Sequence, residues 1–182
     1  MRKTAHTFAH DALGAEIIAR SQASRAPDSA HWQALRFAYA ESSGFDLLGT
    51  KSAETRKAMN EALQSNDYAG ALVHANLILD QNYVDIDAHV IIDIANTKLG
   101  NADEAKKHHS IVIGLLQSIR TGDGKTPETA FTVITVHEEY SLIRIFGLRR
   151  QSQALIADGG AGALTILIRL SSARLQSLRD RA

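Results

Sequence analysis

The chain has 182 residues, with 20 basic and 20 acidic side chains that give a formal net charge of zero. This length suits a single domain, or one domain with a helical appendage, and such a chain buries enough surface to fold without a metal or a disulfide. The balanced charge argues against general nucleic-acid binding, which usually shows as an excess of basic residues. The sequence contains no cysteine, and this excludes disulfides, thiolate catalysis and cysteine-ligated metal centres.

The apolar runs of the sequence are short. None approaches the roughly 20 residues that span a bilayer, so we expect no membrane as a partner. The N-terminal segment lacks the apolar run of a signal peptide, which predicts a cytoplasmic protein. A periplasmic protein is the alternative if the start codon is mis-assigned. We also expect no metal and no cofactor, because no complete metal-binding or nucleotide-binding motif occurs.

The predicted elements divide the chain into three parts. Residues 1–29 form an N-terminal helix, and residues 30–120 form helical hairpins. Residues 121–182 form a small α/β segment with an atypical tail rich in Arg, Leu and Ser. In the second part, apolar residues recur with helical spacing. Four consecutive helices are predicted near residues 53–65, 68–80, 86–99 and 102–120.

The four predicted helices contain an internal repeat. The turn before Ala71 recurs 34 residues later as the turn before Ala105, and both small residues suit close helix packing. Thirty-four residues is the period of the tetratricopeptide repeat, a helix-turn-helix unit. The match is partial, because the large aromatic positions of the first helix hold Thr55 and His89. The pattern therefore predicts a degenerate, tetratricopeptide-like repeat pair.

The pattern changes after Ile119. Residues 131–136 are β-branched and bounded by turn signals, which predicts a strand. A short helix is expected over residues 138–148, and residues 153–156 are a second candidate strand. The predicted fold class is therefore α+β and mostly helical, with the hairpins followed by a small β-containing segment.

The tail from residue 159 to 182 has an unusual composition, without aromatic residues, Val, Lys or Glu. This composition resembles that of a GC-rich gene read in a shifted frame. The alternative is a diverged terminal helix that carries Leu164, Leu167 and Leu175 on one stripe.

Several short motifs together are similar to a known family. They are Trp32-Gln-Ala-Leu-Arg-Phe-Ala-Tyr39, Val84-Asp-Ile-Asp-Ala-His89, His108 with Gly114-Leu-Leu-Gln-Ser-Ile119, Gly122-Asp-Gly-Lys-Thr-Pro-Glu-Thr-Ala-Phe131, and Glu138-Glu-Tyr140. In this order, over roughly residues 30–157, the chain resembles the bacterial family called domain of unknown function 4919. The resemblance implies a repeat-like helical half joined to a small mixed sheet, and it implies no activity.

Histidines and carboxylates supply the candidate chemistry. In a hairpin that turns at Gly100, Asp93 and His108 lie at equal height, and a carboxylate orients a neighbouring imidazole and raises its pKa. A structural histidine with satisfied hydrogen bonds is the alternative. Paired carboxylates around the predicted strand can bind a ligand or act as general acid and base, although turns and the helix dipole also explain them. The candidate catalytic residues are His108, Asp123 and Glu139, and the candidate ligand-binding residues are His89, Lys125, Glu128, Thr129, Glu138 and Tyr140.

Charge is distributed unevenly along the chain. Residues 54–93 carry seven acidic and two basic side chains, and residues 144–182 carry two acidic and seven basic ones. The two regions can attract each other within the fold or between the copies of a homodimer. Asp87 and Asp93 are the candidate partner-binding residues.

Two functional hypotheses follow. The first is a non-enzymatic protein–protein interaction domain with an unknown protein partner, because helical repeats commonly present a surface to a partner. The second is a small-ligand-binding or hydrolytic site at the edge of the C-terminal sheet. The sequence leaves open whether the protein is an enzyme.

Overall fold

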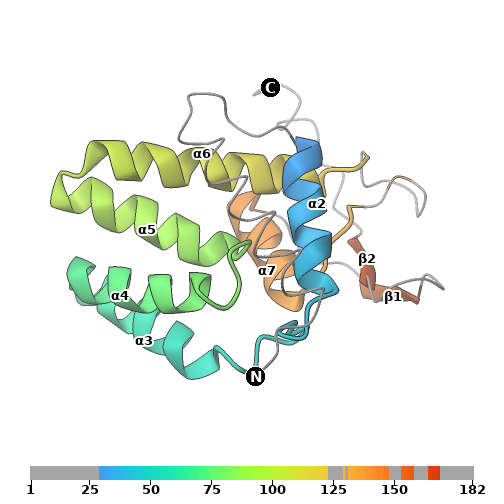
Figure 1. Ribbon diagram of the computed structural model, residues 1–182, viewed down its shortest axis with the longest axis horizontal. Coiled ribbons are helices and arrows are strands. Elements are labelled where there is room, and N and C mark those ends of the chain that lie inside the picture. Colours follow the sequence, from blue (N-terminus) through green and yellow to red (C-terminus); the bar gives the residue numbers. More distant parts are fainter. Residues whose placement is uncertain (1–28, 123–128, 130, 148–152, 158–163, 169–182) are drawn as a thin grey trace.

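The computed structural model describes residues 29–122, 129, 131–147, 153–157 and 164–168 (Figure 1). Its elements, in chain order, are the helices α2 (Ser29–Ala40), α3 (Ala53–Gln64), α4 (Tyr68–Leu79), α5 (Ile86–Leu99), α6 (Ala102–Ile119) and α7 (Val136–Ile145), and the strands β1 (Gln153–Ala157) and β2 (Leu164–Ile168).

Helices α3 to α6 form a stack of antiparallel helices, in which each packs on the next in chain order (Figure 1). Asp67 begins α4 by accepting a hydrogen bond from the backbone N–H of Gly70, and Asp85 begins α5 in the same way from Ala88. Gly100 ends α5 with a φ of 81°, a conformation that glycine adopts at little cost. The four helices lie where the sequence predicts them, so this expectation is confirmed.

The hydrophobic side chains form two cores. The smaller core lies among α3, α4 and α5 and includes Met59 and Ala75, both 0% exposed. The larger core lies where α2 packs across α6, and it includes Trp32 and Leu115. Gly114 permits this close crossing, because a Cβ at that position would lie 2.1 Å from Trp32 Nε1.

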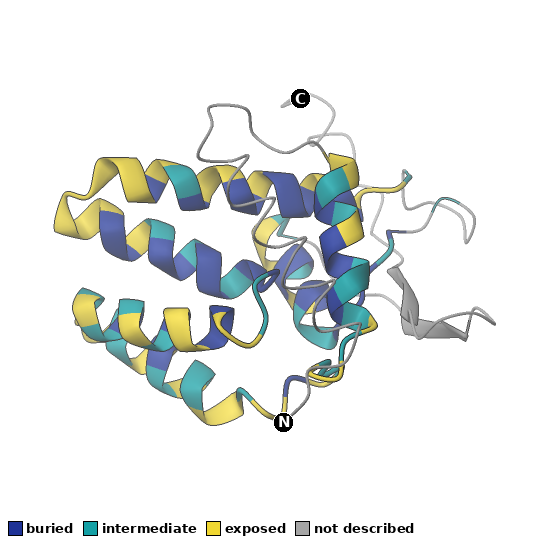
Figure 2. Ribbon diagram, in the orientation of Figure 1, coloured by how far each residue is buried: buried dark blue, intermediate teal, exposed yellow. Residues whose placement is uncertain are grey.

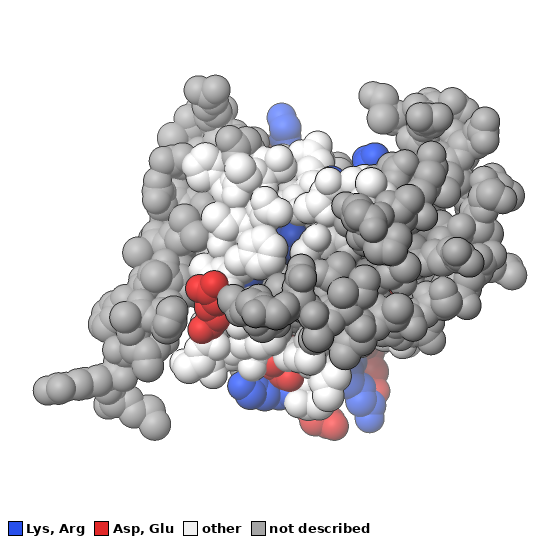
Figure 3. All heavy atoms as spheres, turned by 90° about the vertical axis from the view of Figure 1, so that its right-hand side faces the viewer, with Lys and Arg blue, Asp and Glu red and all other residues white. Residues whose placement is uncertain are grey.

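The helices differ in how much of their surface is buried (Figure 2). The faces of α5 and α6 that meet each other are buried, whereas α3 and α4 carry long exposed stretches. On α4 these include the apolar side chains Val73 and Leu77, which are 60% and 47% exposed. In the view from the side of α2 and the strands, the described surface is mostly uncharged, with acidic and basic side chains mixed along its lower edge (Figure 3).

The expectation of an α+β fold is wrong. Residues 131–135 lead into α7 without forming a strand. Val133 and Ile134, both 0% exposed, are buried in the larger core, so the β-branched run reflects burial rather than sheet pairing. Thr135 then caps α7, because its side chain accepts a hydrogen bond from the backbone N–H of Glu138. Every helix or strand that the structure describes between residues 29 and 147 is therefore a helix.

Strands β1 and β2 pair only with each other among the described segments. The pairing is antiparallel, with Gln153 opposite Ile168 and Ala157 opposite Leu164. The described residues therefore contain no sheet that includes residues 131–136. The alternative of a terminal helix is also wrong where the chain forms β2. No described helix is both long enough and apolar enough to cross a membrane.

Candidate functional site

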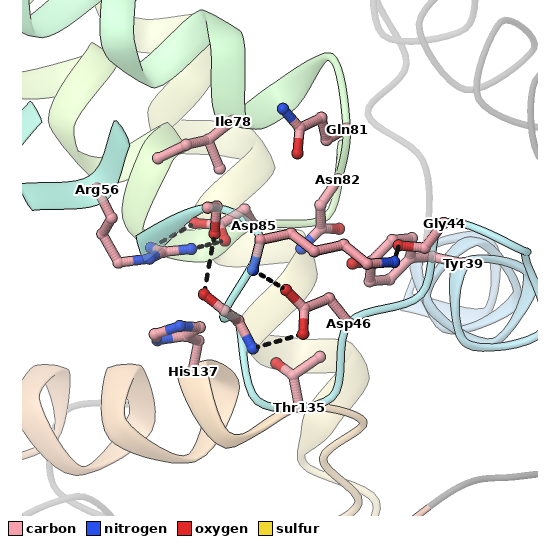
Figure 4. Close-up of a pocket in the computed structure, with 13 residues that line it drawn as sticks. Tyr39, Gly44, Asp46, Arg56, Ile78, Gln81, Asn82, Asp85, Thr135 and His137 are labelled. Atoms are coloured by element: carbon pink, nitrogen blue, oxygen red, sulfur yellow. Dashed lines mark hydrogen bonds and ion pairs between the residues drawn. The ribbon is translucent and has the colours of Figure 1, made fainter. Parts of the chain in front are cut away.

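Polar side chains gather where four segments of the chain meet (Figure 4). The loop between α2 and α3, the start of α3, the loop between α4 and α5 and the start of α7 all contribute to this cluster. We call it the polar junction, and its polar side chains include those of Asp46, Lys51, Arg56, Asp85, Thr135 and His137.

Asp46 shapes the loop on one side of the junction. Its Oδ1 accepts a hydrogen bond from the backbone N–H of Gly49 at 3.0 Å, and its Oδ2 accepts one from Lys51 at 2.7 Å. Burial raises the pKa of Asp46, but these backbone hydrogen bonds outweigh it and hold the pKa below its ordinary value. Gly49 has a φ of 69°, and a Cβ there would lie 1.9 Å from His137 Nε2. The imidazole therefore packs directly on this turn.

Arg56 and Asp85 form the central ion pair of the junction. Arg56 Nη1 and Nη2 donate to Asp85 Oδ1 and Oδ2 at 3.3 and 2.6 Å, a two-point contact between guanidinium and carboxylate. Burial lowers the pKa of Arg56, but the contact with Asp85 outweighs it and raises the pKa above the ordinary value. Burial and then the charge of Arg56 lower the pKa of His137, which favours a neutral imidazole.

Asp87 connects the start of α5 to α7. Its Oδ1 accepts a hydrogen bond from Ser141 Oγ at 2.5 Å and another from Arg144 Nη2. Arg56 Nη1 lies 3.7 Å from its Oδ2. The side chain of Asp87 is only 13% exposed. Asp87, a candidate partner-binding residue in the sequence, thus contacts three side chains of its own chain.

The open space inside the polar junction is small. Its volume is about 30 Å³, and an adjoining space beside Glu138 and Ser141 measures about 10 Å³. One water molecule needs roughly 10–15 Å³ of such space, whereas pockets for organic ligands begin near 300 Å³. The junction therefore has room for one or two water molecules and none for an organic substrate.

Arg36 and Glu138 form a buried ion pair beside the junction. Arg36 is 0% exposed, and its Nε and Nη2 donate to the two carboxylate oxygens of Glu138, both at 2.8 Å. The guanidinium also donates to the backbone carbonyls of Ser118 at 3.1 Å and Thr132 at 2.6 Å. Glu138 Oε2 accepts a further hydrogen bond from the backbone N–H of Ile134 at 2.8 Å. This pair joins α2, α6, α7 and the segment before α7 at one point.

His89 of α5 and His108 of α6 form a second buried pair. Their Nδ1 atoms lie 2.8 Å apart, and His89 Nε2 lies 2.8 Å from the carbonyl oxygen of Tyr83. Burial, followed by the charge of a protonated His108, lowers the pKa of His89 to about 3. Burial also lowers the pKa of His108. The predicted contact between Asp93 and His108 does not form, because Asp93 Oδ2 instead lies 3.0 Å from His109 Nδ1.

The structure describes two of the three candidate catalytic residues. His108 contacts His89, and Glu139 is 0% exposed on α7. Asp123 lies outside the described residues. The convergence of these three residues on one pocket therefore stays a prediction.

The candidate ligand-binding residues are divided in the same way. His89 and Glu138 belong to the two buried pairs. Tyr140 is 49% exposed and Thr129 is half-buried. The other two candidates, Lys125 and Glu128, lie outside the described residues.

An open groove lies between α5 and α6 near the turn at Gly100. It has a volume of about 320 Å³. We call it the hairpin groove, and its polar side chains come from Asp93, Thr97, Lys106 and His109. His109 is 63% exposed and Asp93 is 25% exposed, so the contact between them is accessible to solvent. Asp93, unlike Asp87, lies where a partner can reach it.

Three residues that carry much of this geometry are absent from the candidate site residues that the sequence suggested: Arg36, Arg56 and Asp85. For Arg36 a signal exists, because it follows Leu35 and lies one helical turn after Trp32, on the apolar face of its helix. A charged residue on that face has to find a buried partner. For Asp85 the signal is its place directly before a helix, which predicts a cap but not the contact with Arg56.

The fold and the site together define a small, mainly helical protein in which buried ionisable side chains contact one another. Among the described residues, no three His, Asp or Glu side chains are grouped in a way that could hold a metal ion. Residues 32–159 match the family described as Domain of unknown function (DUF4919). Because this match covers well over half of the chain, the protein belongs to that family. No curated protein and no solved structure matches the chain.

Proposed function

We propose that the protein is a non-enzymatic interaction domain that presents its α3–α6 helices to a protein partner. In this proposal the α3–α4 and α5–α6 hairpins are a degenerate pair of tetratricopeptide-like repeats. The 34-residue spacing of Ala71 and Ala105, both buried in the structure, supports this relationship. Repeats of this kind commonly use one surface to bind a partner segment.

The observation that carries the proposal is that the buried ionisable side chains are hydrogen-bonded to other groups of the protein. A general acid or base has to reach a proton of its substrate, directly or through one water. The carboxylate of Glu138 accepts hydrogen bonds from Arg36 and from the backbone N–H of Ile134. Both ring nitrogens of His89 are hydrogen-bonded to protein atoms. The space inside the polar junction measures only about 30 Å³, and the adjoining space about 10 Å³. These contacts favour a structural role for the side chains that resemble catalytic ones.

The hairpin groove is the proposed place for the partner. Its volume of about 320 Å³ lies within the range of binding pockets. Asp93 supplies a negative charge, Lys106 a positive one and Thr97 a hydroxyl, so the groove can pair with a polar segment of a partner protein. Its lining residues lie near the turn of the hairpin, at the end away from α7.

Site-specific photo-cross-linking in cells tests this proposal. A benzophenone amino acid replaces Thr97 in the groove in one variant, and Glu61 on the exposed face of α3 in the matched control. We expect the groove variant to capture a discrete protein that the control does not capture. Adding Asp93→Lys to the groove variant should remove that product.

The same experiment can contradict the proposal. Equal capture at the two positions would show nonspecific contact, and capture that survives Asp93→Lys would place the partner elsewhere. Asp87→Asn is a useful comparison, because Asp87 contacts Ser141 and Arg144 of its own chain. It should lower stability while leaving the identity of the captured protein unchanged.

A further inference from the structure

The hydrogen bonds of the His89–His108 pair have a defined direction. The carbonyl oxygen of Tyr83 can only accept, so His89 must carry its proton on Nε2, 2.8 Å away. His89 Nδ1 is then unprotonated and accepts a hydrogen bond. The partner nitrogen, His108 Nδ1, lies at 2.8 Å and must therefore carry the proton of its ring.

This direction leaves His108 Nε2 as the nitrogen that can bind a further proton. It lies 3.9 Å from Glu104 Oε2, and the side chain of His108 is 11% exposed. A proton added there creates a cation next to a carboxylate. It also leaves the hydrogen bond from His108 Nδ1 to His89 Nδ1 unchanged.

A second proton has a different effect. Its only place is His89 Nδ1, which already accepts the hydrogen bond from His108. Both rings would then be cations with N–H groups pointing at each other across 2.8 Å, inside a site where His89 is 0% exposed. Like charges repel strongly at such a distance away from water, so the two helices would have to separate there.

We propose that the His89–His108 pair is an acid-operated latch between α5 and α6, which takes up one proton at His108 and stays closed, and opens when a second proton reaches His89. The latch lies one helical turn from Asp93, so its opening also changes the hairpin groove. The two protons belong to the pair as a whole, and they bind in two separate steps.

The charged groups around the pair support this order of binding. At His108, burial and Lys107 lower the pKa, whereas Glu104 of α6 and Asp93 of α5 raise it. At His89, burial, His108 and Lys107 lower the pKa, and the Tyr83 carbonyl and Asp85 raise it, with a result of about 3. The carboxylate of Glu104 raises the pKa of His108 and is not among the groups that act on His89. His108 is therefore the site of the first proton.

Nitrogen-15 NMR of the histidine rings, followed from neutral to acidic pH in the full chain, tests the proposal. At neutral pH we expect the proton of His89 on Nε2 and that of His108 on Nδ1. On acidification, His108 Nε2 should take up a proton while the amide resonances of α5 and α6 keep their positions. Those resonances should change only when His89 is protonated, at a much lower pH.

A surface variant separates the latch from general acid unfolding. Glu104→Gln leaves the buried pair intact and should lower the pKa of His108 by roughly half to one unit. Asp103→Asn, at the neighbouring exposed position, should lower it less. A neutral-pH proton on His108 Nε2 would overturn the proposal, as would an unchanged pKa in Glu104→Gln or separation of α5 from α6 at the first protonation.

Discussion

The buried Arg36–Glu138 pair gives the most direct test of how this fold is held together. Replacing Glu138 by Gln keeps the size of the side chain but removes the negative charge. The Arg36 guanidinium, which is 0% exposed, would keep its positive charge without a counter-ion. Breaking a buried ion pair from one side costs about 3–5 kcal/mol, because an uncompensated charge stays in the interior.

This magnitude is large enough to measure in two ways. We expect Glu138→Gln to lower the free energy of unfolding by about 3–5 kcal/mol in urea titrations followed by circular dichroism. For a chain of this size, each kcal/mol shifts the melting temperature by roughly 2–4 °C. The midpoint of thermal unfolding should therefore fall by about 6–20 °C.

A second variant distinguishes the ion pair from a general loss of packing. Arg36→Met removes the other charge, and the double variant leaves neither charge of this pair. The double variant should therefore lose about 2 kcal/mol less than the sum of the two single changes. Additive losses, or a loss below about 1 kcal/mol for Glu138→Gln, would refute the reasoning. Lys57 and Glu61 supply the control, since they lie 3.9 Å apart but are 69% and 65% exposed, so Glu61→Gln should cost less than about 0.5 kcal/mol.

Three further predictions follow from single contacts. The folded-state pKa of His89, about 3, lies below the ordinary value, so the folded chain binds fewer protons than the unfolded chain in acid. The contribution of His89 to stability is therefore fully present above about pH 6.5 and is lost by roughly 1.4 kcal/mol per pH unit towards pH 3. Urea titrations of His89→Leu should show a shallower dependence of stability on pH. Gly114→Ala places a Cβ 2.1 Å from Trp32 Nε1. It should lower the free energy of unfolding by about 1–2 kcal/mol, although alanine has a better helix propensity than glycine. An unchanged urea midpoint would contradict this close contact. Asp85→Asn keeps a capping side chain but removes the charge beside Arg56. We expect urea titrations to show a free energy of unfolding lower by about 1.5–3 kcal/mol. A loss as small as that of Glu61→Gln would contradict the contact.

The four central helices could be predicted because their signals are local. Asp67 and Asp85 occupy capping positions, and Gly100 ends a helix in the left-handed conformation that glycine tolerates. Apolar residues with helical spacing lie between these signals. Each of these features depends on residues within about one helical turn, which a single sequence contains in full.

The segment from residue 131 to 136 could not be assigned correctly in the same way. A short β-branched run is compatible with a strand or with any other buried segment. What decides is whether another strand lies alongside, and here α2, α6 and α7 surround Val133 and Ile134 instead. Tertiary packing therefore overrides the local preference for a strand. Because this segment is not a strand, the expected α+β fold does not form.

The histidine contacts show a second limit of sequence reasoning. Counting residues from Gly100 placed Asp93 and His108 at the same height, and the contact that forms, between Asp93 and His109, differs by a single residue. One residue along a helix rotates the side chain by about 100°, so His108 points into the hairpin while His109 points outward. Height along a hairpin can be counted from the sequence, but rotation about each helix depends on how the two helices pack.

The residues that carry the family resemblance meet one another in the interior. The first motif supplies Trp32 and Arg36, and these contact Gly114 and Glu138 from motifs that lie far along the chain. His89 and His108, from two further motifs, contact each other in the same way. An active site would bring such residues together around an open cavity, whereas here they join helices to helices. The motifs therefore describe how the fold is assembled, and the surface that a partner would contact has to be sought in residues such as Asp93, which belongs to none of them.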